Sequence, residues 1–230
     1  MSVRKHLTED DRRAIAEAVG RAEAATAGEI VCVLAPEADD YAEVPVAWAA
    51  AAALIVPFLL VFAGLHPSLH LPALGGGWQA GGVQTPILDL TAAYVALQAA
   101  VFAGVFLLLQ WPAARRALTP GALKRAKVRK GAASQFLATG LSAAPDRTGV
   151  LIYASLGDRM VEVIADALIS DKVGPEPWTR AVAAVRDGMR GGRTGGGFVE
   201  AVEVCGAALA QHFPPTGPRA NAFSDEVREL

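Results

Sequence analysis

The sequence predicts a small α/β domain that is interrupted by a hairpin of two membrane-spanning helices. Two uncharged stretches, 44–65 and 90–111, each contain about 22 residues, and about 20 apolar residues are enough for a helix to cross a bilayer. The mean hydropathy of +0.33 is high for a soluble domain, whereas 19% charged residues is too many for a chain buried wholly in lipid. Helix-like and strand-like patterns lie on both sides of the hairpin, which indicates a separate folded domain.

This pattern divides the chain into four parts. We expect 1–43 to hold a helix and the first strand, 44–111 the hairpin, 112–214 the remainder of the domain and 215–230 a loose tail. About 160 residues remain without the hairpin, enough for one domain with a real core. The first and third parts should therefore fold together across the hairpin.

The charge distribution predicts the orientation in the membrane. No acidic residue occurs from Leu90 to Pro145, and the segment 66–89 between the spans has no lysine or arginine. Basic residues close to a span stay in the cytoplasm, so both termini should be cytoplasmic. Anionic headgroups would attract the basic run, and we prefer this interpretation to nucleic-acid binding. The run consists of Arg115, Arg116, Lys124, Arg125, Lys127, Arg129 and Lys130.

The first part predicts a helix over Leu7–Ala25, followed by a strand over Glu29–Ala35. Thr8 is a good N-cap, and Asp11 lies three positions later as in a capping box. The strand is a short apolar run after Glu29, as expected for a strand buried on both faces. Met1–Glu43 has no apolar core of the kind that a secretory signal requires.

The third part predicts a helix, a β-hairpin and two more helices. The strongest strand is the unbroken apolar run 148–155, and a tight turn at 156–159 joins it to a partly alternating strand at 160–165. The glycine-rich stretch 191–197 can be interpreted as an anion-binding loop, but we prefer a flexible connection between two helices. The predicted helices are Ala122–Thr139, about 175–190 and Phe198–Phe213.

Cys32 and Cys205 lie in apolar settings and lack the close spacing of a redox or metal pair. We expect two buried thiols in a reducing compartment. The sequence also contains no phosphate-binding Gly-Lys-Ser/Thr loop, no H-E-x-x-H pair and no G-x-S-x-G elbow.

The pattern resembles the TPM domain family, in a bacterial branch with a transmembrane hairpin after the first strand. The resemblance covers about 7–35 and 122–214. It implies an α/β/α sandwich around a small mixed sheet, and a protein that is anchored in the inner membrane of a bacterium. Many relatives are anchored at one end and face away from the cytoplasm, so their partners do not transfer. The matching segments are 28–31 (GEIV), 148–153 (TGVLIY), 158–166 (DRMVEVIAD), Trp178, Gly197-Phe198 and 211–214 (QHFP).

The resemblance implies that carboxylates near the sheet ends are the candidates for chemistry, because some relatives are reported as acid phosphatases or calcium binders. Calcium requires several converging oxygen ligands, and Arg159 or Lys172 would hold a phosphate. Where many relatives have glycine after the second hairpin strand, this chain has Asp166, Ala167 and Leu168, so the site geometry of the relatives does not transfer directly. Asp158 and Asp146 also have an interpretation as turn residues. The candidate catalytic residues are Asp158, Arg159 and Asp166, and the candidate metal ligands are Asp146, Asp158, Asp166 and Asp171.

Two functions remain open at this point. The first is an accessory or interaction module that is anchored at the cytoplasmic face of the membrane and binds the bilayer and a membrane-protein partner. The second is a slow metal-assisted phosphatase of the acid-phosphatase type, with calcium or magnesium as cofactor. The lack of a nucleophile, a basic pocket motif and a dense carboxylate cluster favours the first, but a fold resemblance cannot decide between them.

Overall fold

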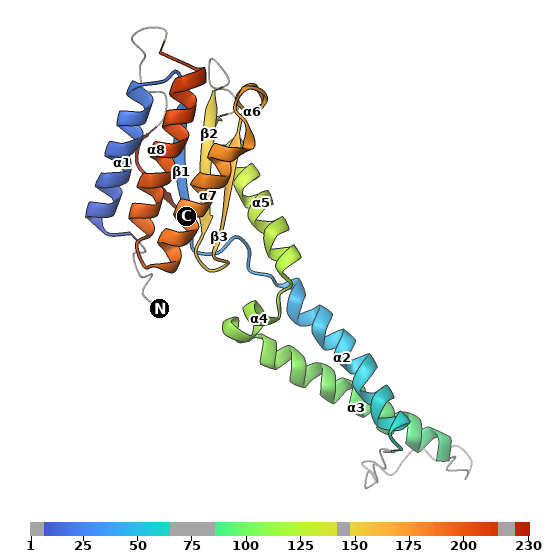
Figure 1. The fold of residues 1–230 in the computed structure, drawn as a ribbon. Coiled ribbons are helices and arrows are strands. Elements are labelled where there is room, and N and C mark those ends of the chain that lie inside the picture. Colours follow the sequence, from blue (N-terminus) through green and yellow to red (C-terminus); the bar gives the residue numbers. More distant parts are fainter. Residues whose placement is uncertain (1–6, 65–85, 142–147, 216–223) are drawn as a thin grey trace. The chain divides into compact units, whose positions relative to one another are not determined.

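A computed structural model describes residues 7–64, 86–141, 148–215 and 224–230. The chain divides into two compact units (Figure 1). One consists of Met1–Asp40 with Pro120–Leu230, and the other of Tyr41–Thr119. The helices of the first unit are α1 (Glu9–Ala24), α5 (Gly121–Ala138), α6 (Ala167–Lys172), α7 (Pro175–Arg190) and α8 (Thr194–His212).

The first unit is built on a small mixed sheet with the strand order β3-β2-β1-β4. Strand β1 is parallel to both β2 and β4, whereas β2 and β3 form an antiparallel hairpin. The predicted strands over 29–35 and 160–165 are confirmed, and the third begins at Gly149 instead of Thr148. The strands are β1 (Glu29–Ala35), β2 (Gly149–Ser155), β3 (Met160–Ala165) and β4 (Arg228–Glu229).

Strand β4 lies in the segment that was predicted to be a loose tail. It pairs with β1 through Val33 and Leu34, and the Leu230 N–H donates to the Leu34 carbonyl at 3.1 Å. Arg12 of α1 forms an ion pair of 2.6 Å with Glu229. These long-range contacts order the end of the chain, and its composition gave no sign of them.

A crossover connects the parallel neighbours β1 and β2. Parallel strands need such a connection, commonly a helix, and α5 supplies it. Residues 41–119, which include both apolar helices, are inserted in the same crossover, between β1 and α5. The register pairs Glu29 with Gly149 and Ala35 with Ser155 along all seven residues. The insertion therefore leaves the pairing of the two central strands intact.

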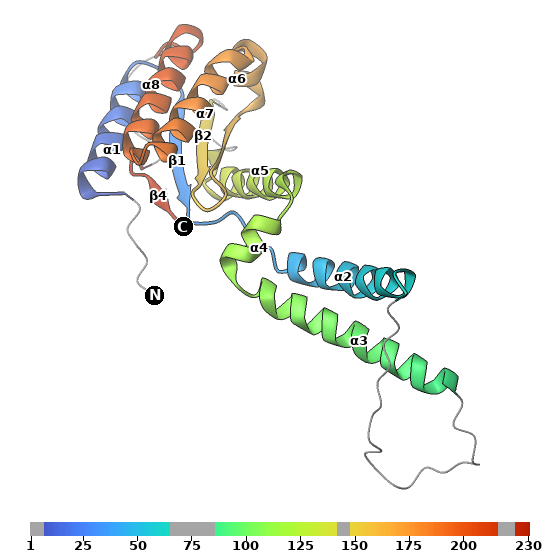
Figure 2. The ribbon, with the colours of Figure 1, turned by 60° about the horizontal axis from the view of Figure 1, so that its bottom comes forward.

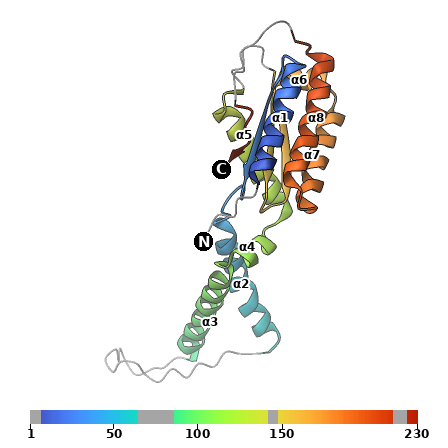
Figure 3. The ribbon, with the colours of Figure 1, turned by 90° about the vertical axis from the view of Figure 1, so that its left-hand side faces the viewer.

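The sheet is covered on both faces, which makes the first unit a three-layer α/β/α sandwich, as the resemblance implies (Figure 3). In β1, Ile30 and Cys32 belong to an apolar cluster shared with α1, α7 and α8. Val31 and Val33 belong to a second cluster, shared with Val128 and other residues of α5. This alternation explains why β1 is apolar from Ile30 to Ala35, because the strand is buried on both faces.

Local sequence signals fix the start of α1. The Thr8 hydroxyl accepts from the Asp11 N–H at 3.1 Å, and the Asp11 carboxylate accepts from the Thr8 N–H at 3.0 Å. This is the predicted capping box. The helices α7 and α8 make a close contact at two glycines: a Cβ on Gly188 would lie 2.8 Å from the Gly197 Cα.

The structure contains two helices that were not predicted, and it moves the start of a third. Helix α8 begins at Thr194, so Gly195–Gly197 belong to its first turn instead of a flexible connection. The short helix α6 was not predicted. The basic segment that was expected to run along the membrane surface begins with a helix, α4 (Pro112–Leu118). A side-chain cap marks the start of α6 alone among these three helices, and α4 and α8 begin without one. The glycines at the start of α8 are poor helix formers, so the sequence predicts a later start for that helix.

The second unit contains two helices that are long and apolar enough to cross a membrane, α2 (Glu43–Phe62) and α3 (Pro86–Leu109). They pack side by side (Figure 2), with Ala49 and Ala53 buried along α2. Larger apolar side chains such as Phe58 and Leu107 remain exposed on these helices. The Trp48 indole donates to the Leu118 carbonyl at 3.0 Å and so connects α2 to α4. Exposed apolar surface of this kind suits contact with lipid.

Candidate functional site

The structure separates the predicted carboxylates between the two ends of the β2–β3 hairpin. Asp158 lies in the turn that follows Ser155, whereas Asp166 follows the last residue of β3 beside Gly149. A strand of six residues spans about 20 Å, whereas calcium ligands lie at about 2.3–2.6 Å from the ion. Asp158 and Asp166 therefore cannot coordinate the same cation. Asp146 lies outside the described residues.

Asp158 fastens the hairpin turn to the segment that follows β1. One of its carboxylate oxygens accepts from the Ser155 hydroxyl at 2.7 Å and from the Ala38 N–H at 3.1 Å. Arg159, the next residue, has a left-handed backbone with φ of +53° and an exposed side chain. These contacts match the interpretation of Asp158 as a turn residue, and Arg159 is the last residue of the turn before β3.

Asp166 acts at the other end of the hairpin as the N-cap of α6. Its side chain accepts from the Leu168 N–H at 3.4 Å, and its own N–H donates to the Gly149 carbonyl at 3.0 Å. Asp171 and Lys172 are exposed on α6, and the Lys172 ammonium lies 4.9 Å from the centre of the Phe213 ring. Asp166 therefore has a structural role in starting the helix.

A second arrangement, which the sequence did not predict, lies beside the edge strand β3. It is a hollow of about 310 Å³ with an apolar floor and a basic rim. Four arginines and one acid line it: Arg125, Arg129, Arg159, Arg186 and Glu162. We call this the arginine hollow.

Three separate elements bring the arginines together. Arg125 and Arg129 are one helical turn apart on α5, Arg186 lies on α7, and Arg159 lies in the turn directly before β3. Val128 and Met160 belong to the apolar cluster under α5, and Val182 packs against the cluster on the other face of the sheet. The hollow therefore extends around the edge of the sheet, with arginines on both of its faces.

The arginine hollow is strongly positive. Among the described residues, no carboxylate lies within ion-pair distance of Arg125, Arg129 or Arg159, and the Arg186 Nε is 3.8 Å from a carboxylate oxygen of Asp187. Guanidinium groups bind carboxylates and phosphates through two parallel hydrogen bonds. The lining residues offer no hydroxyl, thiol or imidazole group. The arginine side chains of the hollow are therefore suited to binding an anion.

Sequence reasoning missed this site for a physical reason. Arg125 and Arg129 were assigned to the lipid-facing basic run, and their i, i+4 spacing was the one available signal that they share a helix face. Nothing in the local sequence connects them to Arg186, because only the packing of α5 and α7 on opposite faces of β3 brings these helices to one edge.

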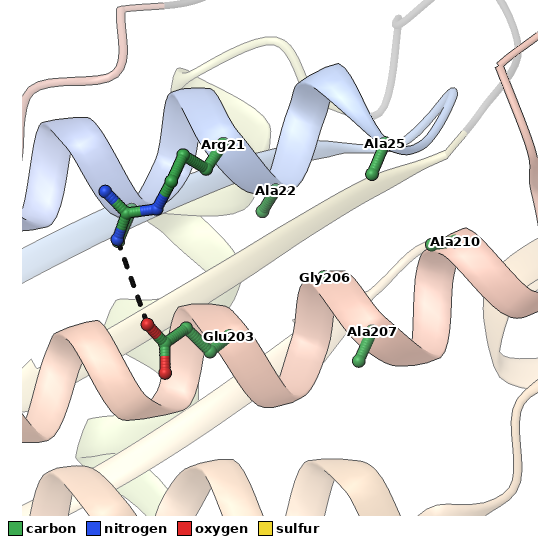
Figure 4. A pocket seen from close by; sticks show the side chains of 8 residues that line it. Arg21, Ala22, Ala25, Glu203, Gly206, Ala207 and Ala210 are labelled. Atoms are coloured by element: carbon green, nitrogen blue, oxygen red, sulfur yellow. Dashed lines mark ion pairs between the residues drawn. The ribbon is translucent and has the colours of Figure 1, made fainter.

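A groove between α1 and α8 differs from the arginine hollow because close helix packing accounts for it (Figure 4). Small side chains such as Ala22 and Ala207 line it, and the Arg21–Glu203 ion pair of 3.8 Å bridges the two helices. A Cβ on Gly206 would lie 2.6 Å from the Ala22 Cβ. The groove results from close helix packing, and its two charges already neutralise one another.

Both cysteines are free and buried, as predicted. Burial raises the pKa of the Cys32 thiol well above its ordinary value, and it raises the pKa of Cys205 to about 12. The thiolate is the reactive form of cysteine, so both side chains act as small apolar residues of the core.

Comparison with known proteins identifies the fold but no family. No protein-family model matches the sequence, and no curated protein is significantly similar to it. The chain is similar to the NMR structure of BA42 protein from the psychrophilic bacterium Bizionia argentinensis. The TM-score is 0.55, with 16% identity over 100% of this chain and 99% of that chain. At this identity the similarity shows a shared fold, so the TPM family remains a resemblance.

Proposed function

We propose that this protein is a membrane-anchored interaction module with a TPM-like domain at the cytoplasmic face of a bacterial inner membrane. The observation that carries the proposal is the arginine hollow, which belongs to a domain whose crossover contains two apolar helices of membrane-spanning length. The hairpin tethers the domain, and the hollow binds an anionic partner. Tethering raises the effective concentration of the domain near membrane partners.

The basic residues between Arg115 and Lys130 support the cytoplasmic orientation. Reporter fusions test it directly. We expect alkaline phosphatase to be active when fused at Gly76 and inactive when fused after Leu230, with the opposite result for a fluorescent protein. Phosphatase activity after Leu230 together with none at Gly76 would overturn the orientation.

The geometry supports an interaction module over the phosphatase. Asp158 and Asp166 lie at opposite ends of the hairpin, and each has a structural hydrogen-bond role. Hydrolysis of an aryl phosphate by the purified chain should not increase with calcium or magnesium. Metal-dependent hydrolysis that disappears in Asp158→Asn or Asp166→Asn would favour the phosphatase.

Cross-linking in intact membranes tests the binding role. The wild-type chain should capture a partner that Arg125→Gln/Arg129→Gln fails to capture, while Arg13→Gln captures it normally. Arg13 is a suitable control because it is an exposed arginine on α1, on the face of the sheet opposite α5. Capture that is unaffected by the double variant would contradict a role for the hollow.

A further inference from the structure

The backbone of β3 offers unused hydrogen-bonding groups to the arginine hollow. In an antiparallel pair, residues alternate between those that exchange hydrogen bonds with the partner strand and those that face away from it. The Asp166 N–H donates to the Gly149 carbonyl. The register then makes residues 164, 162 and 160 the bonded positions, so Val161 and Val163 direct their N–H and C=O groups toward the free edge.

The outer edge of β3 has no neighbouring strand among the described residues, because β3 is the outermost strand of the sheet. The hollow includes Arg159, Met160, Val161 and Glu162, so it covers the first half of the edge. At the far end, the Ala165 carbonyl accepts from the Ser170 hydroxyl at 3.5 Å. The stretch 160–164 is therefore the part of the edge that an added strand would pair with.

The arginines are placed where the side chains of an added strand would project. Successive side chains of a strand point to opposite faces of the sheet. Arg125 and Arg129 lie on the face covered by α5, and Arg186 lies on the face covered by α7. Acidic side chains on an added strand would meet guanidinium groups on both faces.

We propose that the arginine hollow binds an extended acidic segment of a partner protein, which adds to the sheet as a strand alongside β3. Main-chain hydrogen bonds to Val161 and Val163 would supply affinity, and carboxylate–guanidinium pairs would supply specificity. The inference rests on the proposed function and names the chemistry of its partner.

The positive charge of the hollow favours an acidic strand over a second copy of the chain. If two β3 strands paired about a two-fold axis, one set of four arginines would face another at close range, and such contacts between like charges are costly. An anionic lipid headgroup would neutralise the arginines of one face, but it would leave the backbone groups of β3 unused. An acidic strand satisfies both sets of groups.

The test uses the full-length protein in nanodiscs of phosphatidylcholine, which carries no net charge. The probe is the fluorescein-labelled peptide Thr-Glu-Glu-Val-Glu-Glu-Val-Thr, followed by anisotropy at low salt. We expect saturable binding that becomes about tenfold weaker in Arg125→Gln/Arg129→Gln and in Arg186→Gln, with Arg13→Gln as the matched control. These are exposed side chains, and unchanged thermal unfolding will show that the variants fold. No saturable binding at about 1 mM peptide, a free energy of about −4 kcal/mol, overturns the proposal.

Two N-methylated versions of the peptide separate strand addition from simple charge attraction. One is methylated at alternate backbone nitrogens and the other at the remaining nitrogens. In a strand, one set of N–H groups faces β3 and the other faces solvent. One peptide should therefore lose binding about tenfold and the other should retain it, and equal behaviour of the two overturns strand addition.

Short-chain phosphatidylglycerol provides the last comparison. If it binds the hollow more tightly than the peptide and displaces it, the hollow belongs to a lipid headgroup and the strand proposal fails. The proposed function fails separately, since it requires arginine-dependent capture in membranes. If capture persists while the two methylated peptides behave alike, the interaction module stands without strand addition.

Discussion

The two faces of the sheet are covered very differently. On one face, α1, α7 and α8 enclose a large apolar cluster that includes Phe198 and Val202. On the other, α5 is the one helix among the described residues that covers a smaller cluster around Val128 and Tyr153, and its exposed side carries arginines. Stability depends on the area of apolar surface removed from water, so the three-helix face contributes most of it. The α5 face contributes less, and its helix is the one that brings charge to the edge of the sheet.

The largest expected effect is in the three-helix cluster. Phe198 is fully buried on α8, and removing its ring in Phe198→Ala should lower the free energy of unfolding by about 3–5 kcal/mol. Leu137→Ala on α5 should change it by less than about 0.5 kcal/mol, because that side chain is 67% exposed. Denaturant unfolding of the detergent-solubilised protein measures both. Equal losses would mean that the buried Phe198 ring contributes no more to stability than an exposed side chain.

The next effect concerns the contact between α7 and α8. A Cβ on Gly188 would lie 2.8 Å from the Gly197 Cα and 2.8 Å from the Arg193 carbonyl oxygen. Gly188→Ala should therefore cost about 1–3 kcal/mol, because backbone atoms must move apart. Gly174→Ala is the matched control, since nothing lies within 4 Å of a Cβ there. A stable Gly188→Ala variant would mean that the two helices separate easily.

The stability of the domain should depend on pH through a residue of the three-helix face, Glu23. Burial is the main cause that raises the pKa of Glu23 on α1 from 4.5 to about 7, with Glu29 and Asp225 adding to it. The folded state then holds a proton between about pH 4.5 and 7 that the unfolded state has released, so this contribution to stability falls as the pH rises through that window. The Ile30 N–H donates to the Glu23 carboxylate at 2.8 Å, and glutamine keeps an acceptor there.

Glu23→Gln should therefore raise the melting temperature at pH 8 by a few degrees and leave it nearly unchanged at pH 4.5. Thermal unfolding at the two pH values measures this. Glu17→Gln, at an exposed position on the same helix, should keep the wild-type dependence. A wild-type pH profile in Glu23→Gln would assign the titration to another group.

The smallest expected effect on stability is at the arginine hollow. Arg125→Gln/Arg129→Gln should change the free energy of unfolding by less than about 0.5 kcal/mol, because both side chains are exposed and lack acidic partners among the described residues. The same variant should lose partner binding. A large loss of stability would make these arginines part of the core support and remove the functional difference between the two faces.

The sequence predicted most of the fold because the signals were local. The run Glu29–Ala35 has a single plausible structure as a buried strand, and Thr8 with Asp11 marks a helix start. The site was not predictable in the same way. Asp158 and Asp166 are close in the sequence, but an antiparallel hairpin places them far apart. Arg125 and Arg186 are far apart in the sequence and meet only through tertiary packing.

The insertion in the crossover has a consequence for biosynthesis. Strand β1 leaves the ribosome early, but its partner β2 follows only about 120 residues later, which at typical rates of translation is a delay on the order of ten seconds. During that time β1, which is apolar from Ile30 to Ala35, lacks its partner β2, while the apolar helices between them become available to the membrane. Membrane insertion of the helices would hold both flanks of the crossover at one surface. The hairpin would then also act as an aid to folding, because it keeps the early strand close to the place where its partner emerges.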